Sequence, residues 1–215
     1  MIIVVSKLDT ENIYEILKQR IIHLKYDPGQ VLNEVDIAAE FNISRTPIRR
    51  VFHQLHNDKL LNIVPRFGAQ VTPIDFKQMK CIFELTRELG PFATRLAVER
   101  ISDENIKELE EIMARLESYD ISKDYQSAIN DDNRFHTIIF SSCDNPWLQD
   151  SLTQLHYHTE RLWHYCERYF DSMDLFTNTL GKVLEAIKEK DTEKAEKYAR
   201  DHIDEFVLKI KTDML

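Results

Sequence analysis

Apolar residues recur along most of the chain at the spacing of amphipathic helices, most regularly after Thr72. Capping residues and short breaks divide this part into helices predicted at 75–100, 103–119, 122–142, 145–169, 172–190 and 192–211. The connections are short, so neighbouring helices are expected to run antiparallel. The pattern predicts a mainly α protein in which residues 74–215 form a bundle of about six helices.

Residues 33–72 carry a second pattern, that of two short helices followed by a hairpin. Asn33 and Ser44 are each suited to cap the start of a helix. Pro47 falls in the first turn of the second helix, where its missing N–H is tolerated. The apolar stripe of that helix consists of Ile48, Val51 and Leu55. These signals predict a helix-turn-helix.

The hairpin has strands predicted at 61–65 and 69–72. Gly68 stands beside its tip, where a positive φ angle is expected. The preceding helix opens with S-R-T-P-I-R-R, so its arginines lie off the apolar stripe, near the helix end that favours phosphate. Such a helix can enter the major groove of duplex DNA. Residues 1–73 are therefore predicted to form a winged helix-turn-helix that binds DNA.

The net charge of −9 is unevenly distributed along the chain. Residues 1–72 contain nine Lys and Arg against eight Asp and Glu, whereas the remainder contains nineteen against twenty-nine. Between Ser44 and Phe67 there are five basic residues and one acidic residue, Asp58. Positive charge is thus concentrated on the predicted DNA-reading segment, and the acidic remainder would repel DNA elsewhere.

Cysteine content and hydropathy indicate a cytoplasmic protein. Cys81, Cys143 and Cys166 are odd in number and lack C-x-x-C spacing, which favours buried, reduced thiols over disulfides or a zinc finger. The chain has no apolar run of membrane-spanning length, so no membrane association is expected.

The motif S-R-T-P-I-R at 44–49 and the wing sequence G-A-Q-V at 68–71 resemble those of the GntR family of bacterial regulators. The resemblance covers roughly the first third of the chain. It implies that the arginine after the helix cap and the arginine four residues later contact DNA, and that the wing contributes a glycine. Together with their neighbours, the expected DNA-binding residues are Ser44, Arg45, Thr46, Arg49, Arg50, Arg66 and Gly68.

The second part resembles the all-helical effector-binding domain of the FadR subfamily of that family. The matching fragments are R-E-L-G-P-F-A-T-R-L-A at 87–97, N-D-D-N-R-F-H-T-I-I-F at 130–140, V-L-E-A-I-K-E-K-D at 183–191 and A-R-D-H-I at 199–203. The resemblance implies that residues 74–215 bind an effector and mediate dimerisation.

Many members of this subfamily hold a metal ion with one aspartate and three histidines. The resemblance places the aspartate and two of the histidines at Asp132, His136 and His202, and puts Leu180 where the remaining histidine would stand. Asp132 and His136 are four residues apart and share one helix face. A divalent ion (zinc, nickel or manganese) with an open coordination position is one interpretation. The alternative is a metal-free polar pocket.

The effector implied by the resemblance is an organic acid. Family members often carry an arginine and a glutamate before the proline that corresponds to Pro91, but Thr86 and Gly90 stand at those positions. The candidate carboxylate-binding residues are therefore Arg87, Arg134 and Arg161. For Arg134 and for Arg161, the alternative is that the side chain is a surface cation that binds no effector. His156, His158 and His164 are interpreted as packing or solvated residues, because their spacings place them mostly on different helix faces.

Two classes of function remain open. The favoured one is a ligand-responsive transcription regulator, such as a repressor, that binds a palindromic DNA operator as a homodimer. The rival is an enzyme or metal-dependent binding module that a DNA-binding domain localises. No arrangement of catalytic residues stands out, so the protein is predicted not to be an enzyme.

Overall fold

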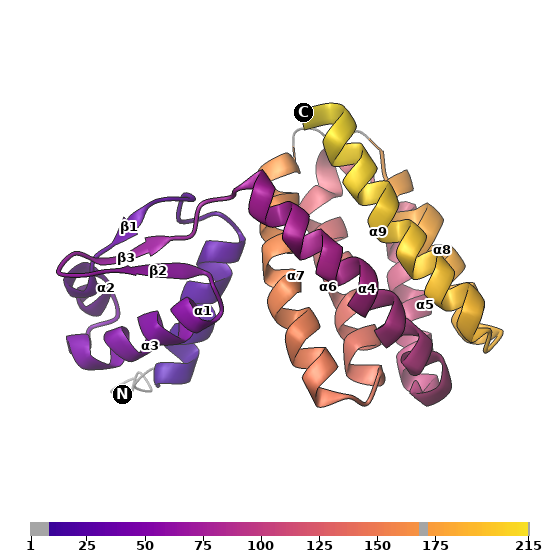
Figure 1. Cartoon of the computed structure of the whole chain (residues 1–215), viewed down its shortest axis with the longest axis horizontal. Coiled ribbons are helices and arrows are strands. Elements are labelled where there is room, and N and C mark those ends of the chain that lie inside the picture. The colour runs from indigo at the N-terminus through magenta and orange to yellow at the C-terminus, as the bar shows by residue number, and fades with distance from the viewer. Residues whose placement is uncertain (1–8, 168–171, 215) are drawn as a thin grey trace, which may run out of the picture. The chain divides into compact units, whose positions relative to one another are not determined.

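The computed structural model describes residues 9–167 and 172–214. The chain divides into two compact units, one ending at Asp75 and the other beginning at Phe76 (Figure 1). The first unit combines short helices with a small sheet, and the second is built of helices alone. This architecture confirms the predicted fold class, a winged helix-turn-helix followed by a helical bundle.

The first unit begins with α1 (Thr10–Ile22), a helix that the sequence analysis did not predict. Asp9 caps it by accepting a 2.8 Å hydrogen bond from the Asn12 amide. The apolar side chains at every fourth position, Ile13, Leu17 and Ile21, are fully buried. They pack α1 against α3 (Arg45–Asn57), so α1 supplies a wall of the core of this unit.

The helix-turn-helix consists of α2 (Glu34–Glu40) and α3. The predicted cap at Asn33 is confirmed, because its side chain accepts a 2.7 Å hydrogen bond from the Val35 amide. Ser44 occupies the N-cap position of α3 in an extended conformation, without a side-chain capping bond. The predicted stripe of α3 is buried, and Phe52 is buried with it. Burial of this stripe fixes which face of α3 remains exposed.

The sheet has three antiparallel strands in the order β1-β3-β2. The hairpin strands are β2 (Leu61–Val64) and β3 (Gly68–Val71), close to the predicted bounds. The additional strand β1 (Val31–Leu32) was not predicted, and it pairs with β3 rather than β2. Gly68 has the expected positive φ, +120°. The wing is therefore attached to the segment that leads directly into α2.

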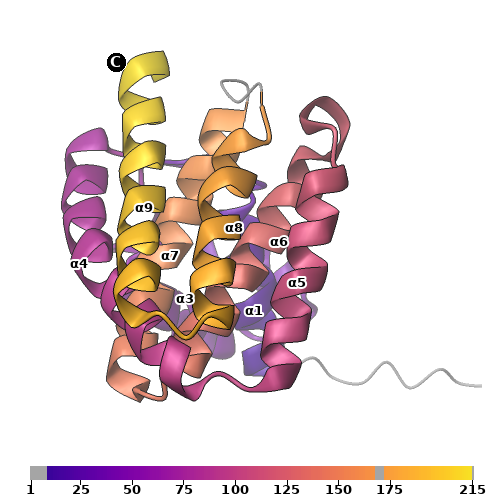
Figure 2. The same cartoon turned by 90° about the vertical axis from the view of Figure 1, so that its right-hand side faces the viewer.

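The second unit contains six helices in the described residues: α4 (Phe76–Arg100), α5 (Asp103–Ser118), α6 (Ile121–Ser142), α7 (Pro146–Cys166), α8 (Asp174–Lys188) and α9 (Thr192–Met214). Their bounds follow the predicted ones closely, although the predicted end of the fourth helix at residue 169 lies outside the described residues. Helix α9 lies beside α4 and α8, α5 packs on α6 and α8, and α7 packs on α4 and α6 (Figure 2).

Helix α4 continues through Pro91, which has no N–H to donate to the carbonyl of Arg87, four residues earlier. That carbonyl instead accepts a 3.0 Å hydrogen bond from the guanidinium of Arg200 on α9. The Arg87 side chain in turn forms a bidentate ion pair with Asp204, at 2.6 and 2.9 Å. The proline is thus accommodated by polar contacts from a neighbouring helix.

Two expectations about the chain as a whole can be compared with the structure. Cys143 and Cys166 are buried free thiols, but the expectation of burial is wrong for Cys81, which lies exposed on α4. Among the helices that the structure describes, none is long and apolar enough to cross a membrane.

Candidate nucleic-acid interface and ligand cavity

Four of the seven predicted DNA-binding residues gather at one place on the surface of the first unit. These four, Arg45, Arg49, Arg66 and Gly68, line a single surface hollow of about 350 Å³ between α2, α3 and the hairpin. Ser44, Thr46 and Arg50 are exposed at the start of α3 but do not line this hollow. The fold thus brings Arg45 and Arg49 of α3 to the same hollow as Arg66 of the wing tip.

Two residues of this hollow were not anticipated from the sequence. Glu34, the first residue of α2, forms a bidentate ion pair with Arg49, with N–O distances of 3.0 and 2.8 Å. His53 lies one turn further along α3 from Arg49 and also lines the hollow. The acidic partner gives Arg49 a defined orientation before any DNA is bound.

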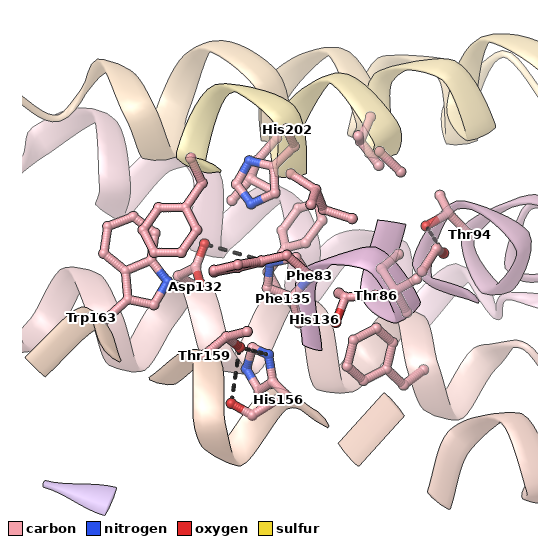
Figure 3. Close-up of a pocket in the computed structure, with 18 residues that line it drawn as sticks. Phe83, Thr86, Thr94, Asp132, Phe135, His136, His156, Thr159, Trp163 and His202 are labelled. Atoms are coloured by element: carbon pink, nitrogen blue, oxygen red, sulfur yellow. Dashed lines mark hydrogen bonds and ion pairs between the residues drawn. The ribbon is translucent and has the colours of Figure 1, made fainter. Parts of the chain in front are cut away.

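A second polar site lies inside the helical bundle (Figure 3). Asp132 and His136 project from α6 and His202 from α9, and one ligand atom from each lies within 4.8 Å of the others. The Asp132 Oδ1 atom lies 3.7 Å from His136 Nε2. The Asp132 side chain is almost completely buried. The structure therefore brings together all three residues that the resemblance proposed as metal ligands.

His156 on α7 also belongs to this site, although the sequence analysis interpreted it as a packing or solvated residue. Its ring centroid lies 5.2 Å from that of His136, and the His202 ring lies 5.3 Å from His136 on the opposite side (Figure 3). His156 Nε2 donates a 2.8 Å hydrogen bond to Asn133 Oδ1. His158 and His164, by contrast, do not line the cavity.

These polar groups line a cavity of about 60 Å³ whose walls are mostly apolar. Leu180 of α8 forms part of the wall. The preceding residue, Thr179, is buried and places its hydroxyl 2.7 Å from His202 Nδ1. Thr86 and Gly90 also line the cavity, so the expected effector-binding positions face inward but carry small side chains here.

Burial removes charge from this cavity. It lowers the pKa of His136 to about 4, and those of His156 and His202 to about 3, the latter two with a further contribution from the positive charge of His136. Burial, reinforced by the negative charge of Glu160, raises the pKa of Asp132 to about 8. At neutral pH the imidazoles are therefore unprotonated, as metal coordination requires, whereas Asp132 carries a proton that a bound ion would displace.

The residues fit a divalent ion. Asp132 Oδ1 is buried and accepts no hydrogen bond from any described residue. Two ligand atoms on one tetrahedral ion, with bonds of about 2.0–2.1 Å, lie roughly 3.3 Å apart. The 3.7 Å separation of Asp132 Oδ1 and His136 Nε2 is close to that spacing and longer than a hydrogen bond. Small side-chain movements would bring Asp132, His136 and His202 into one coordination sphere.

None of the three arginines considered for effector binding lines this cavity. Arg134 lies on the surface of α6 and forms a bidentate ion pair with Glu108 of α5 at 2.6 and 2.9 Å. Arg87 faces a separate groove between α4 and α9, where Asp204 holds it. Arg161 is buried, contrary to the surface alternative, and burial lowers its pKa to about 10.

In the metal-free protein, the contribution of Asp132 and the three cavity histidines to stability should be greatest near pH 6.5. Below this pH the three histidines gain protons in the unfolded chain, at their ordinary pKa of 6.5, but not in the native cavity, so stability falls with acidification. Above pH 6.5, Asp132 keeps its proton in the native protein up to about pH 8. In the unfolded chain, where its pKa is 3.8, Asp132 has already lost that proton. Stability is therefore also lost as pH rises towards 8. Urea denaturation of chelator-treated protein from pH 5 to 9 measures the free energy of unfolding, and thus both the acidic and the alkaline loss of stability.

Asp132→Asn is the matched variant for this measurement, since it removes the carboxyl proton and retains the side-chain shape. The alkaline loss should disappear in this variant and the acidic loss should remain. If the variant still loses stability at alkaline pH as the wild type does, that loss does not come from Asp132.

The two units together define a DNA-binding transcriptional regulator with an all-helical second domain. Residues 9–71 match the family described as bacterial regulatory proteins, gntR family, and residues 81–205 match the FCD domain. The chain belongs to the GntR family of bacterial regulators and carries an FCD domain. Its relatives are transcriptional regulators rather than enzymes, which confirms the prediction that the protein is not an enzyme.

The chain resembles relatives over most of its length. It is 26% identical over 195 residues to the HTH-type transcriptional regulator YdhC of Bacillus subtilis (strain 168), covering 88% of this chain and 85% of that protein. It is 22% identical over 195 residues to the HTH-type transcriptional repressor RspR of Escherichia coli (strain K12), covering 91% and 86%. The solved structure of E. coli McbR/YncC has the same fold, with a TM-score of 0.81, 22% identity and coverage of 94% and 97%.

Proposed function

We propose that this regulator is a homodimeric repressor that binds a palindromic operator and is controlled by a small carboxylate-bearing effector in the bundle cavity. The observation that carries the DNA part is the grouping of Arg45, Arg49 and Arg66 around one hollow of the first unit. One short recognition helix offers few base contacts, and a twofold dimer would place two of them on half-sites about one helical turn apart. The similarity to the repressor RspR supports repression.

The observation that carries the ligand part is the cluster of Asp132, His136 and His202 inside the bundle. We propose that these three side chains hold a divalent ion: zinc, nickel or manganese. The ion would supply a positive centre to which an effector carboxylate can bind. His202 would coordinate through Nε2 while its Nδ1–H donates to Thr179, which fixes the ring orientation. Leu180 contributes no ligand, so at least one coordination position would remain for water or the effector.

The cavity shape is consistent with a small effector. Thr86 and Gly90 stand where the resemblance to the FadR subfamily implies an arginine and a glutamate, and a Cβ on Gly90 would lie 3.4 Å from Ile203. Within the described lining there is no cationic side chain of Lys or Arg to bind a carboxylate directly. An effector that favours one spacing of the two DNA-binding domains in a dimer would change operator affinity through this preference alone.

Replacing Arg45 or Arg49 with alanine should weaken operator binding roughly tenfold to a hundredfold each, because an arginine that reads a guanine edge contributes through two hydrogen bonds. Gel-shift titration against the DNA upstream of the protein's own gene measures the effect. Arg134→Ala is the matched control, since it also removes an exposed arginine held by a bidentate glutamate, but on the bundle. Wild-type affinity in both Arg45→Ala and Arg49→Ala would refute the proposed DNA-reading surface.

A further inference from the structure

Glu34 is the only acidic side chain among the described residues that line the DNA-facing hollow. Its two carboxylate oxygens accept hydrogen bonds from Arg49, one from Nε at 3.0 Å and one from Nη2 at 2.8 Å. The Glu34 side chain is 21% exposed and the Arg49 side chain 60% exposed. An acid on a surface that meets a polyanion is unfavourable by itself, so its presence needs a compensating role.

The electrostatic surroundings keep this acid ionised. The hydrogen bonds from Arg49 lower the pKa of the Glu34 carboxyl, and the nearby charges of Arg45 and His53 lower it further. Glu34 is also the first residue of α2, where the helix dipole favours a negative charge. The carboxylate can therefore hold Arg49 throughout the neutral pH range.

The ion pair occupies only one edge of the guanidinium. Arginine has five N–H donors, and Glu34 takes the donors on the Nε and Nη2 side. The other edge, formed by Nη1 and the second Nη2 hydrogen, has the parallel geometry that matches O6 and N7 of guanine. Because both hydrogen bonds to Glu34 must be kept, the guanidinium plane is fixed and the remaining edge is directed.

We propose that Glu34 is a positioning residue that fixes the Arg49 guanidinium so that its Nη1/Nη2 edge reads a guanine in the operator. The inference rests on the proposed function, in which Arg49 contacts DNA. A side chain oriented in advance loses less conformational freedom on binding, and a fixed plane accepts guanine while rejecting bases that lack its paired acceptors. Glu34 would thus contribute to discrimination between bases more than to attraction for the DNA backbone.

A role for Glu34 as a competitor of DNA, the opposite of positioning, predicts a different change in operator affinity. If Glu34 merely competed with DNA for Arg49, its removal would release a cation and delete a repulsive charge, so specific and non-specific binding would both tighten. Positioning predicts that specific binding weakens although a repulsive charge has been removed. The sign of the change in operator affinity therefore separates the two roles.

The test uses full-length Glu34→Ala and Glu34→Gln, with Asp36→Asn as the control that removes an exposed acid from the same helix. Each variant is titrated against the wild-type operator, operators with single guanine substitutions, and an unrelated duplex. Glu34→Ala should bind the operator about tenfold more weakly, bind the unrelated duplex no more weakly, and lose discrimination at one guanine. Glu34→Gln retains one acceptor and should show a smaller loss, and it also keeps the test valid if the alanine variant folds poorly. Asp36→Asn should retain the discrimination.

The double variant Glu34→Ala with Arg49→Ala separates this proposal from the one on which it rests. Positioning through Arg49 requires that Glu34→Ala has no further effect on discrimination once Arg49 is absent. If Arg49→Ala weakens operator binding but both Glu34 variants bind and discriminate like the wild type or better, the positioning role is refuted and the DNA-reading surface stands. If Arg49→Ala itself binds like the wild type, the assignment of Arg49 fails first and the positioning role falls with it.

Discussion

His136→Ala should abolish binding of zinc, nickel and manganese to the bundle. His136 lies between His202 and His156, and its Nε2 is 3.7 Å from the orphaned Oδ1 of Asp132, so its loss leaves only two of the proposed ligands. Affinity should fall by more than about 100-fold, because removal of a direct ligand exceeds the 10- to 100-fold losses typical of supporting residues. Calorimetric titration of chelator-treated protein measures the affinity directly.

Leu180→His should have the opposite effect. Leu180 faces the cavity, so a histidine there would add a fourth protein ligand, and zinc or nickel affinity should rise markedly. Leu184→His is the matched control, since it introduces the same group one helical turn further along α8 at a buried position that does not line the cavity. The native site, one ligand short, should release metal readily to chelators.

Thermal stability provides a second measurement of the metal site. An ion at a concentration 100 times its dissociation constant should stabilise the native protein by about 2.7 kcal/mol, and this increment should be absent in His136→Ala. The metal assignment fails if purified wild-type protein carries no metal and none of the three ions changes its melting temperature. The cavity would then be a site for a purely organic effector, and the proposed regulation would remain possible.

Gly68→Val should weaken operator binding strongly and destabilise the first unit while leaving the bundle nearly unchanged. Gly68 has a φ of +120°, which side-chain-bearing residues rarely adopt, and a Cβ there would lie only 2.2 Å from the carbonyl oxygen of Leu32. The combined strain and clash should cost about 3 kcal/mol or more. Because β1 and β3 pair at this point, the substitution should displace the wing from the start of α2.

Gly29→Val is the matched control for this prediction. Gly29 also has a positive φ, +87°, but a Cβ there meets no atom within 4 Å. It therefore carries the backbone strain without the collision, and the loss should be clearly smaller. Gel-shift titration and thermal unfolding followed by circular dichroism measure the two effects. Equal losses at both glycines would show that backbone conformation alone is responsible, and loss of the bundle transition would show that the wing supports the second unit.

The bundle was predictable because its helices are separated by local signals. Caps such as Ser102, Asn145 and Asp120 accept hydrogen bonds from amides in the first turn of the helix that follows, so a few adjacent residues determine each boundary. Strand β1 has no comparable signal, since its two residues become a strand only by pairing with β3, about forty positions later. Helix α1, which was not predicted, carries local signals of the same kind, namely the Asp9 cap and apolar residues at every fourth position.

The sites show the same division between local and distant information. Asp132 and His136 share a face because they are four residues apart, and the resemblance supplied His202. His156 was missed because spacing within α7 does not tell which face meets α6, where Asn133 binds it. The Glu34–Arg49 pair was missed for a similar reason, because it joins two helices whose relative orientation depends on the packing of the first unit.

The hydrogen bond from Arg200 to the carbonyl of Arg87 replaces a backbone hydrogen bond that Pro91 cannot donate. A backbone hydrogen bond of that kind joins two residues of the same helix, whereas the bond from Arg200 joins α4 to α9. Separating the two helices would leave a carbonyl without its partner, so sliding of α9 should draw α4 with it. Because α9 carries His202 and α4 is the first helix of the second unit, a proline that ordinarily interrupts a helix here leads to a direct bond between the first helix of the bundle and a helix that lines the cavity.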